Sequence, residues 1–99
     1  MDKVLQLLSL SQRAGKIASG EFKTEESVKS GQAWLVILAS DASDNTKKKF
    51  TNMCEFYEVP CIVYSTKDDL GHFIGKEFRA SLAVTDEGLA NKILEQTRL

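Results

Sequence analysis

The sequence is poor in side chains that hold metal ions. It contains two cysteines, Cys54 and Cys61, which form no CxxC pair, and a single histidine, His72. A structural zinc site takes about four cysteine or histidine ligands, so the sequence predicts no metal site. Two thiols without a larger cysteine framework are typical of a reducing compartment. We therefore expect a cytoplasmic protein.

The chain also lacks a long hydrophobic run. Its longest apolar stretch covers residues 33–39, whereas a helix needs about 20 apolar residues to span a bilayer. No apolar segment followed by a small-residue cleavage site opens the sequence, so no signal peptide is predicted. We expect a soluble protein without a membrane partner.

Neither sign of charge is in excess. The 99 residues include 13 basic and 14 acidic side chains, for a formal net charge of −1. This balance excludes a protein that coats nucleic acid by bulk charge, so any nucleic-acid site must come from local clustering. The length and the ordinary 42% of hydrophobic residues predict a single globular domain over residues 1–99.

Motifs of enzyme chemistry are absent as well. The sequence has no GxSxG, GxGxxG or GxxxxGK[ST] motif. Ser40, Asp41 and His72 are the residue types of a hydrolytic triad, but no elbow places the serine as a nucleophile. The acidic pair at 25–26 is interpreted as solvated charge, and the pair at 68–69 as charge in the first turn of a helix, where it faces the helix dipole. We expect no enzyme activity and no cofactor.

What is present is a regular alternation of helical and strand patterns. The run at 33–39 has no polar alternation and should be covered on both faces, as in a sheet between helix layers. This order predicts an α/β fold, a three-layer α/β/α sandwich around one small sheet. Strands are expected at 16–18, 33–39, 61–64 and 80–85. The first expected helix ends near residue 15, and the second covers 20–30. The remaining helices are expected from 43–44 to 57, between 66 and 75, and over 86–97.

The predicted helix over 20–30 is unusual because it is almost entirely polar. Only Phe22 and Val28 are large and apolar, and their spacing builds no broad core stripe. We expect a surface helix with one thin contact and an exposed Phe22. Gly20 at its start leaves backbone N–H groups without a side chain above them, which suits a phosphate or a base edge.

Three groups of residues could bind nucleic acid. Basic residues surround Gly20, three lysines follow one another at 47–49, and a loop at 76–80 pairs an aromatic side chain with an arginine. Phenylalanine and arginine stack on unpaired bases in RNA. Two alternatives stay open, because the lysines could be ordinary solubility charge and Phe78 could belong to the core.

The same residues, taken in order, carry a family resemblance over essentially the whole chain. The matching segments are Gly15-Lys16-Ile17, Gly20, Gly31, 35–42, 45–47, Cys54-Glu55 with Tyr57, Val59-Pro60, Leu70-Gly71, Ile74-Gly75-Lys76 and 85–88. With them the chain resembles the kink-turn-binding ribosomal proteins of the L7Ae and L30e group, most closely the small bacterial members of YlxQ type.

The resemblance implies a four-stranded mixed sheet and the recognition of structured RNA, such as ribosomal RNA. In this family the helix opened by the counterpart of Gly20 enters the major groove at a kink with sheared G·A pairs. The loop matching 78–80 covers unpaired bases. Ribosomal proteins or translation factors are possible partners. The predicted RNA-binding residues are Arg13, Lys16, Gly20, Phe22, Lys23, Lys47, Phe78 and Arg79.

The chain departs from the family pattern at three positions of this helix. Members typically carry an Asn-Glu pair after the glycine and a lysine three residues on, where this chain has Phe22, Lys23 and Glu26. The acid repels phosphate, whereas Lys23 adds a cation. A second hypothesis is therefore a protein-interaction module on the same fold, with Phe22 as its anchor.

Overall fold

The computed structural model describes residues 2–98 and confirms the predicted alternation of helices and strands. The elements are α1 (Lys3–Arg13), β1 (Ile17–Ser19), α2 (Glu21–Lys29), β2 (Leu35–Leu38), α3 (Asp44–Tyr57), β3 (Cys61–Val63), α4 (Lys67–Phe73), β4 (Ser81–Val84) and α5 (Glu87–Thr97). β2, β3 and β4 are shorter than the predicted strands, whereas β1 has the predicted length and begins one residue later.

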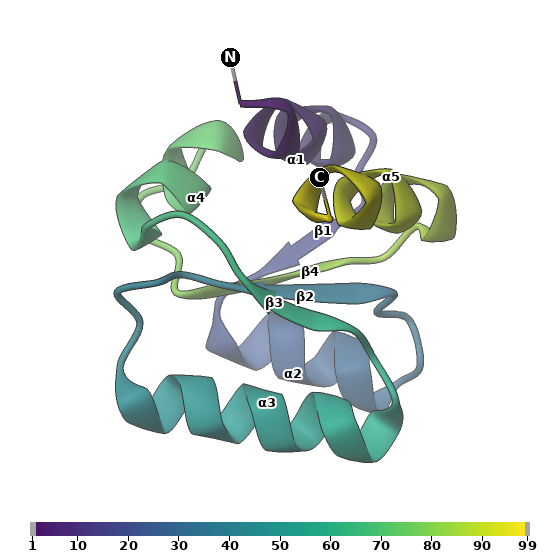
Figure 1. Ribbon diagram of the computed structural model, residues 1–99, viewed down its shortest axis with the longest axis vertical. Coiled ribbons are helices and arrows are strands. Elements are labelled where there is room, and N and C mark those ends of the chain that lie inside the picture. The colour runs from purple at the N-terminus through teal and green to yellow at the C-terminus, as the bar shows by residue number, and fades with distance from the viewer. Residues whose placement is uncertain (1, 99) are drawn as a thin grey trace.

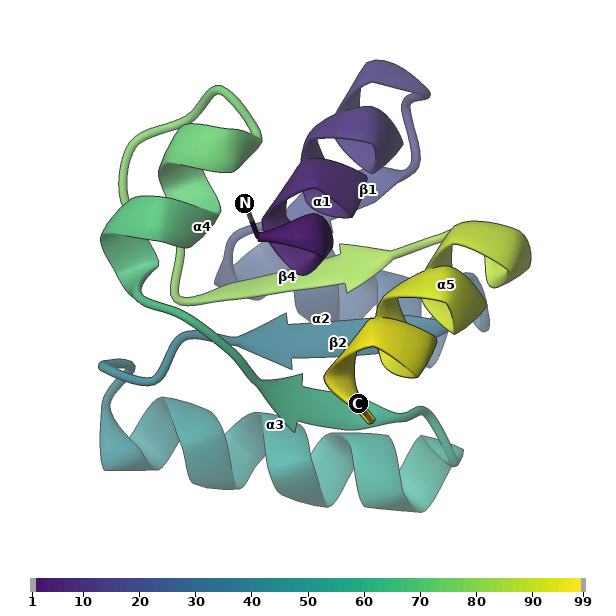
Figure 2. The same ribbon diagram turned by 45° about the horizontal axis from the view of Figure 1, so that its top comes forward.

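The four strands form one mixed sheet with the order β1-β4-β2-β3. β4 is antiparallel to both of its neighbours, and β2 is parallel to β3. Helices α2 and α3 cover one face of the sheet, and α1, α4 and α5 cover the other (Figures 1 and 2). The predicted α/β/α sandwich with a four-stranded mixed sheet is therefore confirmed.

The two central strands explain the apolar run in the sequence. Every residue of β2 and β4 is buried. Alternate side chains of β2 enter different cores, with Leu35 and Ile37 facing the α1, α4 and α5 layer. Val36 and Leu38 pack with Phe50 on the opposite face. The absence of polar alternation thus reflects helix layers on both sides.

Most helices begin at a side chain that caps the first turn. Ser43 accepts a hydrogen bond from the Thr46 backbone N–H at 3.1 Å, and Thr66 accepts one from Asp69 at the same distance. Asp2 and Asp86 cap α1 and α5 in the same way. These oxygens satisfy backbone donors that have no partner within the helix.

α2 packs more closely on the sheet than its sequence suggests. Val28 is buried as expected, but Thr24 and Ser27 are buried too. The Ser81 hydroxyl in β4 donates to that of Thr24 at 3.4 Å. The expected thin contact is wrong, because small polar side chains allow the helix backbone to approach the strands. None of the helices within residues 2–98 is both long and apolar enough to cross a membrane.

Candidate functional site

One end of the sheet gathers segments that are far apart in the sequence. The Gly20 N–H donates to the Ser81 carbonyl at 3.0 Å, and the Ala39 N–H donates to the Ala80 carbonyl at 2.9 Å. The end of β1, the end of β2 and the start of β4 therefore meet at one edge. We call the surface formed by Gly20, residues 39–40 and residues 78–80 the Gly20 end.

The backbone at Gly20 explains the glycine. Its φ of 93° and ψ of 163° lie in a region that is essentially restricted to glycine. The Gly20 carbonyl accepts from the Thr24 N–H at 3.0 Å and so begins α2. Within residues 2–98, no side-chain hydrogen bond caps this helix. Its first-turn N–H groups thus present partial positive charge without a side chain over them.

The loop that precedes β4 is held against α4 by a close backbone contact at Gly71. A Cβ placed on Gly71 would lie 1.4 Å from the Glu77 carbonyl oxygen. The Lys76 N–H donates to the Gly71 carbonyl at 2.8 Å, and the Arg79 N–H donates to that of Lys67 at 3.1 Å. The absence of a side chain at residue 71 therefore fixes the course of the loop.

This loop presents an aromatic ring and an arginine at the Gly20 end. Phe78 is 65% exposed, which excludes the alternative that it belongs to the core. Arg79 Nε donates to Ser19 Oγ at 3.3 Å, and its Nη1 donates to the Phe78 carbonyl at 2.8 Å. The guanidinium thus links the loop to the end of β1 and stays partly accessible.

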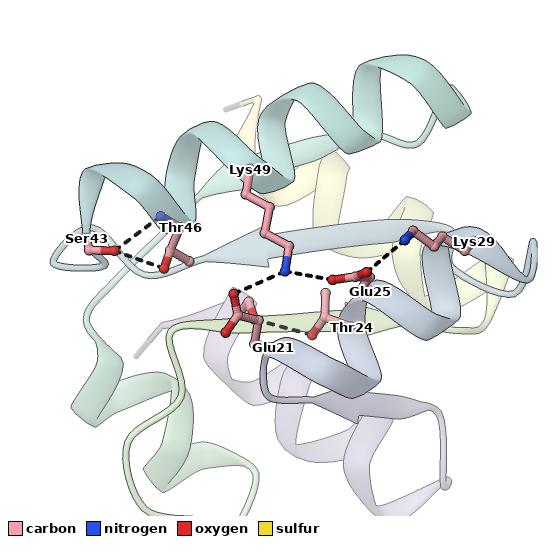
Figure 3. A network of polar contacts seen from close by, with 8 residues as sticks. Glu21, Thr24, Glu25, Lys29, Ser43, Thr46 and Lys49 are labelled. Atoms are coloured by element: carbon pink, nitrogen blue, oxygen red, sulfur yellow. Dashed lines mark hydrogen bonds and ion pairs between the residues drawn. The ribbon is translucent and has the colours of Figure 1, made fainter.

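The three consecutive lysines at 47–49 have different surroundings, since they follow one another around α3. Lys47 Nζ donates to the Ser40 carbonyl at 2.6 Å, which places this cation at the Gly20 end. Lys48 is exposed and has no ion-pair partner among residues 2–98. Lys49 points toward α2 instead. Its Nζ lies 3.2 Å from Glu21 Oε1 and 2.7 Å from Glu25 Oε1 (Figure 3).

This ion-pair network lowers the negative charge that α2 presents. Glu25 also pairs with Lys29 at 2.8 Å, and the hydrogen bonds from Lys29 and Lys49 lower the pKa of the Glu25 carboxyl to about 2. The same contacts raise the pKa of Lys49 and Lys29. The sequence hypothesis of a solvated acidic pair therefore missed the contacts of Glu25. Glu26 is exposed and forms no ion pair within the described part of the chain.

Phe22 and Lys23 lie in the first turn of α2, beside the Gly20 end. Phe22 is 75% exposed, as predicted, and lines a shallow depression with Glu25 and Glu26. Lys23 is exposed and follows Glu21 by two residues, about 200° around the helix. Because Glu21 faces α3, Lys23 projects from the opposite flank of α2, away from Lys49.

Arg13 and Lys16 do not join this group. The Lys16 carbonyl accepts from the Thr85 N–H at 2.9 Å, beyond the far end of the β1–β4 pairing. Four residues of extended chain, about 13 Å, separate it from Gly20. Arg13 lies at the end of α1 and lines a groove with Phe73 and Lys92. Of the eight predicted residues, Gly20, Lys47, Phe78 and Arg79 are brought together, and Phe22 and Lys23 lie alongside.

The histidine and the two cysteines form no metal-binding group. No cluster of three or more potential ligands of the His, Cys, Asp or Glu type occurs in residues 2–98. His72 is exposed, with its ring edge-on to Phe73. Cys54 and Cys61 are free thiols, and the hydrogen bond between them together with burial raises the pKa of Cys54.

Comparison with protein families yields a match over nearly the whole chain. The model of the ribosomal protein L7Ae/L30e/S12e/Gadd45 family matches residues 2–94. A protein of Bacillus subtilis (strain 168), named RNA-binding protein YlxQ, is 46% identical over 88 residues, which are 89% of this chain and 88% of that protein. A protein of the same name from Enterococcus faecium is 38% identical and covers 94% of this chain and 89% of its own length.

Solved structures share the fold along the full length. A protein of unknown function from Bacillus halodurans has a TM-score of 0.96 and 37% identity, with all of both chains covered. A 15.5 kD RNA binding protein from Giardia lamblia has a TM-score of 0.81 at 23% identity, over 99% of this chain and 88% of that one. The second likeness concerns the fold alone.

Proposed function

Because this chain belongs to the ribosomal protein L7Ae/L30e/S12e/Gadd45 family, we propose that it binds structured RNA through the Gly20 end and the adjacent first turn of α2. The relatives from Bacillus subtilis and Enterococcus faecium are named RNA-binding proteins, which supports this assignment. The observation that carries it is the exposed Phe78 ring beside Arg79 and the uncapped start of α2.

Each part of this surface suits a different part of an RNA. The N–H groups that follow Gly20 and the ammonium groups of Lys23 and Lys47 contact phosphates, and Gly20 lets the RNA backbone approach closely. Phe78 stacks on a base that has left the helix, and Arg79 lies over the same nucleotide or its phosphate. Such a site reads an irregular RNA shape rather than a continuous duplex.

Salt-dependent binding measurements separate these roles. In a gel-shift series, Lys23→Ala lowers the slope of log affinity against log salt by about one, because one phosphate contact is lost. Phe78→Ala weakens binding by roughly 1–3 kcal/mol and leaves the slope almost unchanged. Lys48→Ala serves as a control, since this lysine lies on α3 outside the Gly20 end. If Lys23→Ala changes neither affinity nor slope, the site assignment is wrong.

A finer proposal is that the RNA contains a kink with sheared G·A pairs. The test compares an RNA with this kink to the same RNA with Watson–Crick pairs in place of the G·A pairs. Tight binding that the replacement abolishes supports the proposal. Glu26→Lys restores the cation that family members typically carry and should strengthen binding to the kinked RNA, because a repelled phosphate becomes an attracted one.

We also propose that the RNA target belongs to the ribosome or to the translation apparatus, as the name of the family suggests. Co-sedimentation with ribosomal particles in a sucrose gradient tests this. The Phe78→Ala variant should move to the top of the gradient. If the parent chain and Phe78→Ala sediment equally, ribosome association does not depend on the Gly20 end.

The second candidate is a protein-interaction module, and its supporting observation is the 75% exposure of Phe22. Phe22→Ala distinguishes the two functions. If every RNA binds weakly and binding disappears at moderate salt regardless of the kink, the interaction module is favoured. A loss of RNA affinity in Phe22→Ala would instead place this ring in the RNA interface.

A further inference from the structure

A second surface lies on the α1, α4 and α5 layer, across the sheet from α2 and α3 (Figures 1 and 2). It is a groove of about 730 Å³. Its apolar lining comes from Leu7, Leu10 and Phe73, and its cationic lining from Lys3, Arg13 and Lys92. The groove shares only Arg13 with the residues predicted to bind RNA.

The apolar part of the groove is left open by the fold. Leu10, in the last turn of α1, is 45% exposed. Leu7 and Phe73 are half-buried against the core and continue the apolar surface at the base of Leu10. An exposed leucine next to a concave apolar surface is typical of a site that receives apolar side chains from another molecule.

The charges around this surface have one dominant sign. α1 contains no carboxylate, and its cations stand at both ends, with Lys3 and Arg13 about 15 Å apart along the helix. Lys92 adds a third cation from α5, and Glu95 is the only acidic residue in the lining. None of the three cations forms an ion pair within residues 2–98. The chain as a whole, by contrast, carries a net charge of −1.

This pattern selects the chemistry of the occupant. Leucine and phenylalanine in a groove between helices match the apolar face of an amphipathic helix, which inserts side chains spaced three and four residues apart. The separated cations match carboxylates at the two ends of that face. A nucleic acid would use the cations but leave the apolar surface around Leu10 without a partner.

We propose that the α1–α4–α5 groove binds an acidic amphipathic helix of a partner protein, with leucine-type side chains over Leu10 and carboxylates near Lys3 and Arg13. The groove and the Gly20 end have no residue in common. The proposed partner and the proposed RNA therefore contact different side chains.

The probe for this proposal is a labelled helical peptide of about sixteen residues, with leucines along one face and two glutamates about ten residues apart. A matched peptide carries lysines in place of the glutamates. In fluorescence anisotropy with the full chain, the acidic peptide should bind saturably and about ten-fold more tightly than the lysine peptide.

Variants of the chain locate the site. Leu10→Asp should weaken binding of the acidic peptide by about ten-fold or more, since a carboxylate would enter the apolar contact. Arg13→Glu should weaken the acidic peptide and strengthen the lysine peptide, a charge swap that loss of folding cannot imitate. Phe56→Asp, at a ring that is 77% exposed on α3, is the matched surface control and should bind like the parent chain.

Amide NMR shifts complete the test. Shifts confined to α1, α4 and α5 on addition of the acidic peptide support the proposal, whatever the outcome of the RNA measurements. Equal binding of both peptides, no saturation at millimolar concentration, or an unchanged affinity of Leu10→Asp would overturn it. If kinked RNA shifts these same amides and Arg13→Glu weakens only the RNA, the groove is a nucleic-acid surface and the proposal is wrong.

Discussion

The contact between Gly71 and the loop before β4 can be tested by a single methyl group. In Gly71→Ala the new Cβ would lie 1.4 Å from the Glu77 carbonyl oxygen and 3.2 Å from the Phe78 nitrogen. Contacts under 3.0 Å essentially never occur for a real Cβ, so the two atoms must separate by about 1.6 Å. The Cβ is fixed to the backbone of α4, and the oxygen belongs to the backbone of the loop, so no side-chain rotation can relieve the contact. The loop or the end of α4 therefore has to move.

The cost follows from the position of the loop. Inserting a methylene-sized group into a packed contact typically costs 1–3 kcal/mol, roughly. Alanine in place of glycine within a helix returns up to about 1 kcal/mol of helix stability. Because Phe78 and its neighbours at 76–77 are exposed, the loop can yield without opening the core. We expect a net loss of about 1–2 kcal/mol, or roughly 5–15 °C in Tm for a domain of this size.

The assay combines thermal unfolding, followed by circular dichroism, with RNA affinity. Gly71→Ala should lower Tm, shift the amide signals of Phe78 and Arg79, and weaken RNA binding. Gly88→Ala is the matched control, since its Cβ would meet only Asp86 Oδ2 at an ordinary 3.4 Å in α5. Its Tm should stay equal or rise. A Gly71→Ala protein with the parent Tm and unchanged loop signals would refute the reasoning.

Three further perturbations test the neighbouring structure. Gly20→Ala has free space around its Cβ but a backbone that alanine avoids, so urea unfolding should show a loss of about 1–3 kcal/mol from strain alone. Thr24→Val leaves the buried Ser81 hydroxyl without its partner and should cost about 1–3 kcal/mol, and adding Ser81→Ala should recover part of that loss in a double-mutant cycle. Lys49→Met should raise the pKa of Glu25 from about 2 toward 4.5 in a carboxyl ¹³C titration. Since the pKa of Glu25 is lower in the folded than in the unfolded state, its contribution to the free energy of unfolding is present above pH 4.5 and is lost as the pH falls toward 2. Lys49→Met should therefore lose less free energy of unfolding than the parent chain between pH 4.5 and 2.

The layered fold could be predicted because its main signals are local. The uninterrupted apolar run around β2 requires cover on both faces. Helical spacing identifies the apolar side of α3 as Phe50, Met53, Cys54 and Tyr57, of which Phe50 and Cys54 are buried and Tyr57 is 40% exposed. Ser43 and Thr66 stand where a cap is needed before their helices. In each case the residues that decide the structure lie within a few positions of one another.

The course of α2 on the sheet could not be predicted, because it depends on residues distant in the sequence. Thr24 and Ser27 look like surface residues on a polar helix, yet they are buried because β4 accepts small hydroxyl side chains there. The Glu25–Lys29 pair has the favourable spacing of four and could have been found. The Lys49 contacts could not, since they join α2 to α3 across the layer.

The candidate site, too, was predictable only in the features that depend on residues close together in the sequence. The sequence identified the residue types of the Gly20 end but grouped them with Arg13 and Lys16 by proximity in the chain. Four residues of a helix keep side chains within one turn, whereas four residues of a strand separate them by about 13 Å. The turn after α1 and the strand β1 lie between these cations and Gly20, so residues that are close in the sequence are far apart in the structure.

The arrangement of charge explains how a chain with one net negative charge can still present a local cationic surface. Lys49 forms ion pairs with Glu21 and Glu25, and Lys29 forms one with Glu25. These four charges therefore largely cancel at the side of α2 that faces α3. Lys23 projects from the other flank and keeps its charge for a ligand. Net charge therefore excludes only a bulk attraction for RNA, because ion pairing within the fold decides which cations remain available at the Gly20 end.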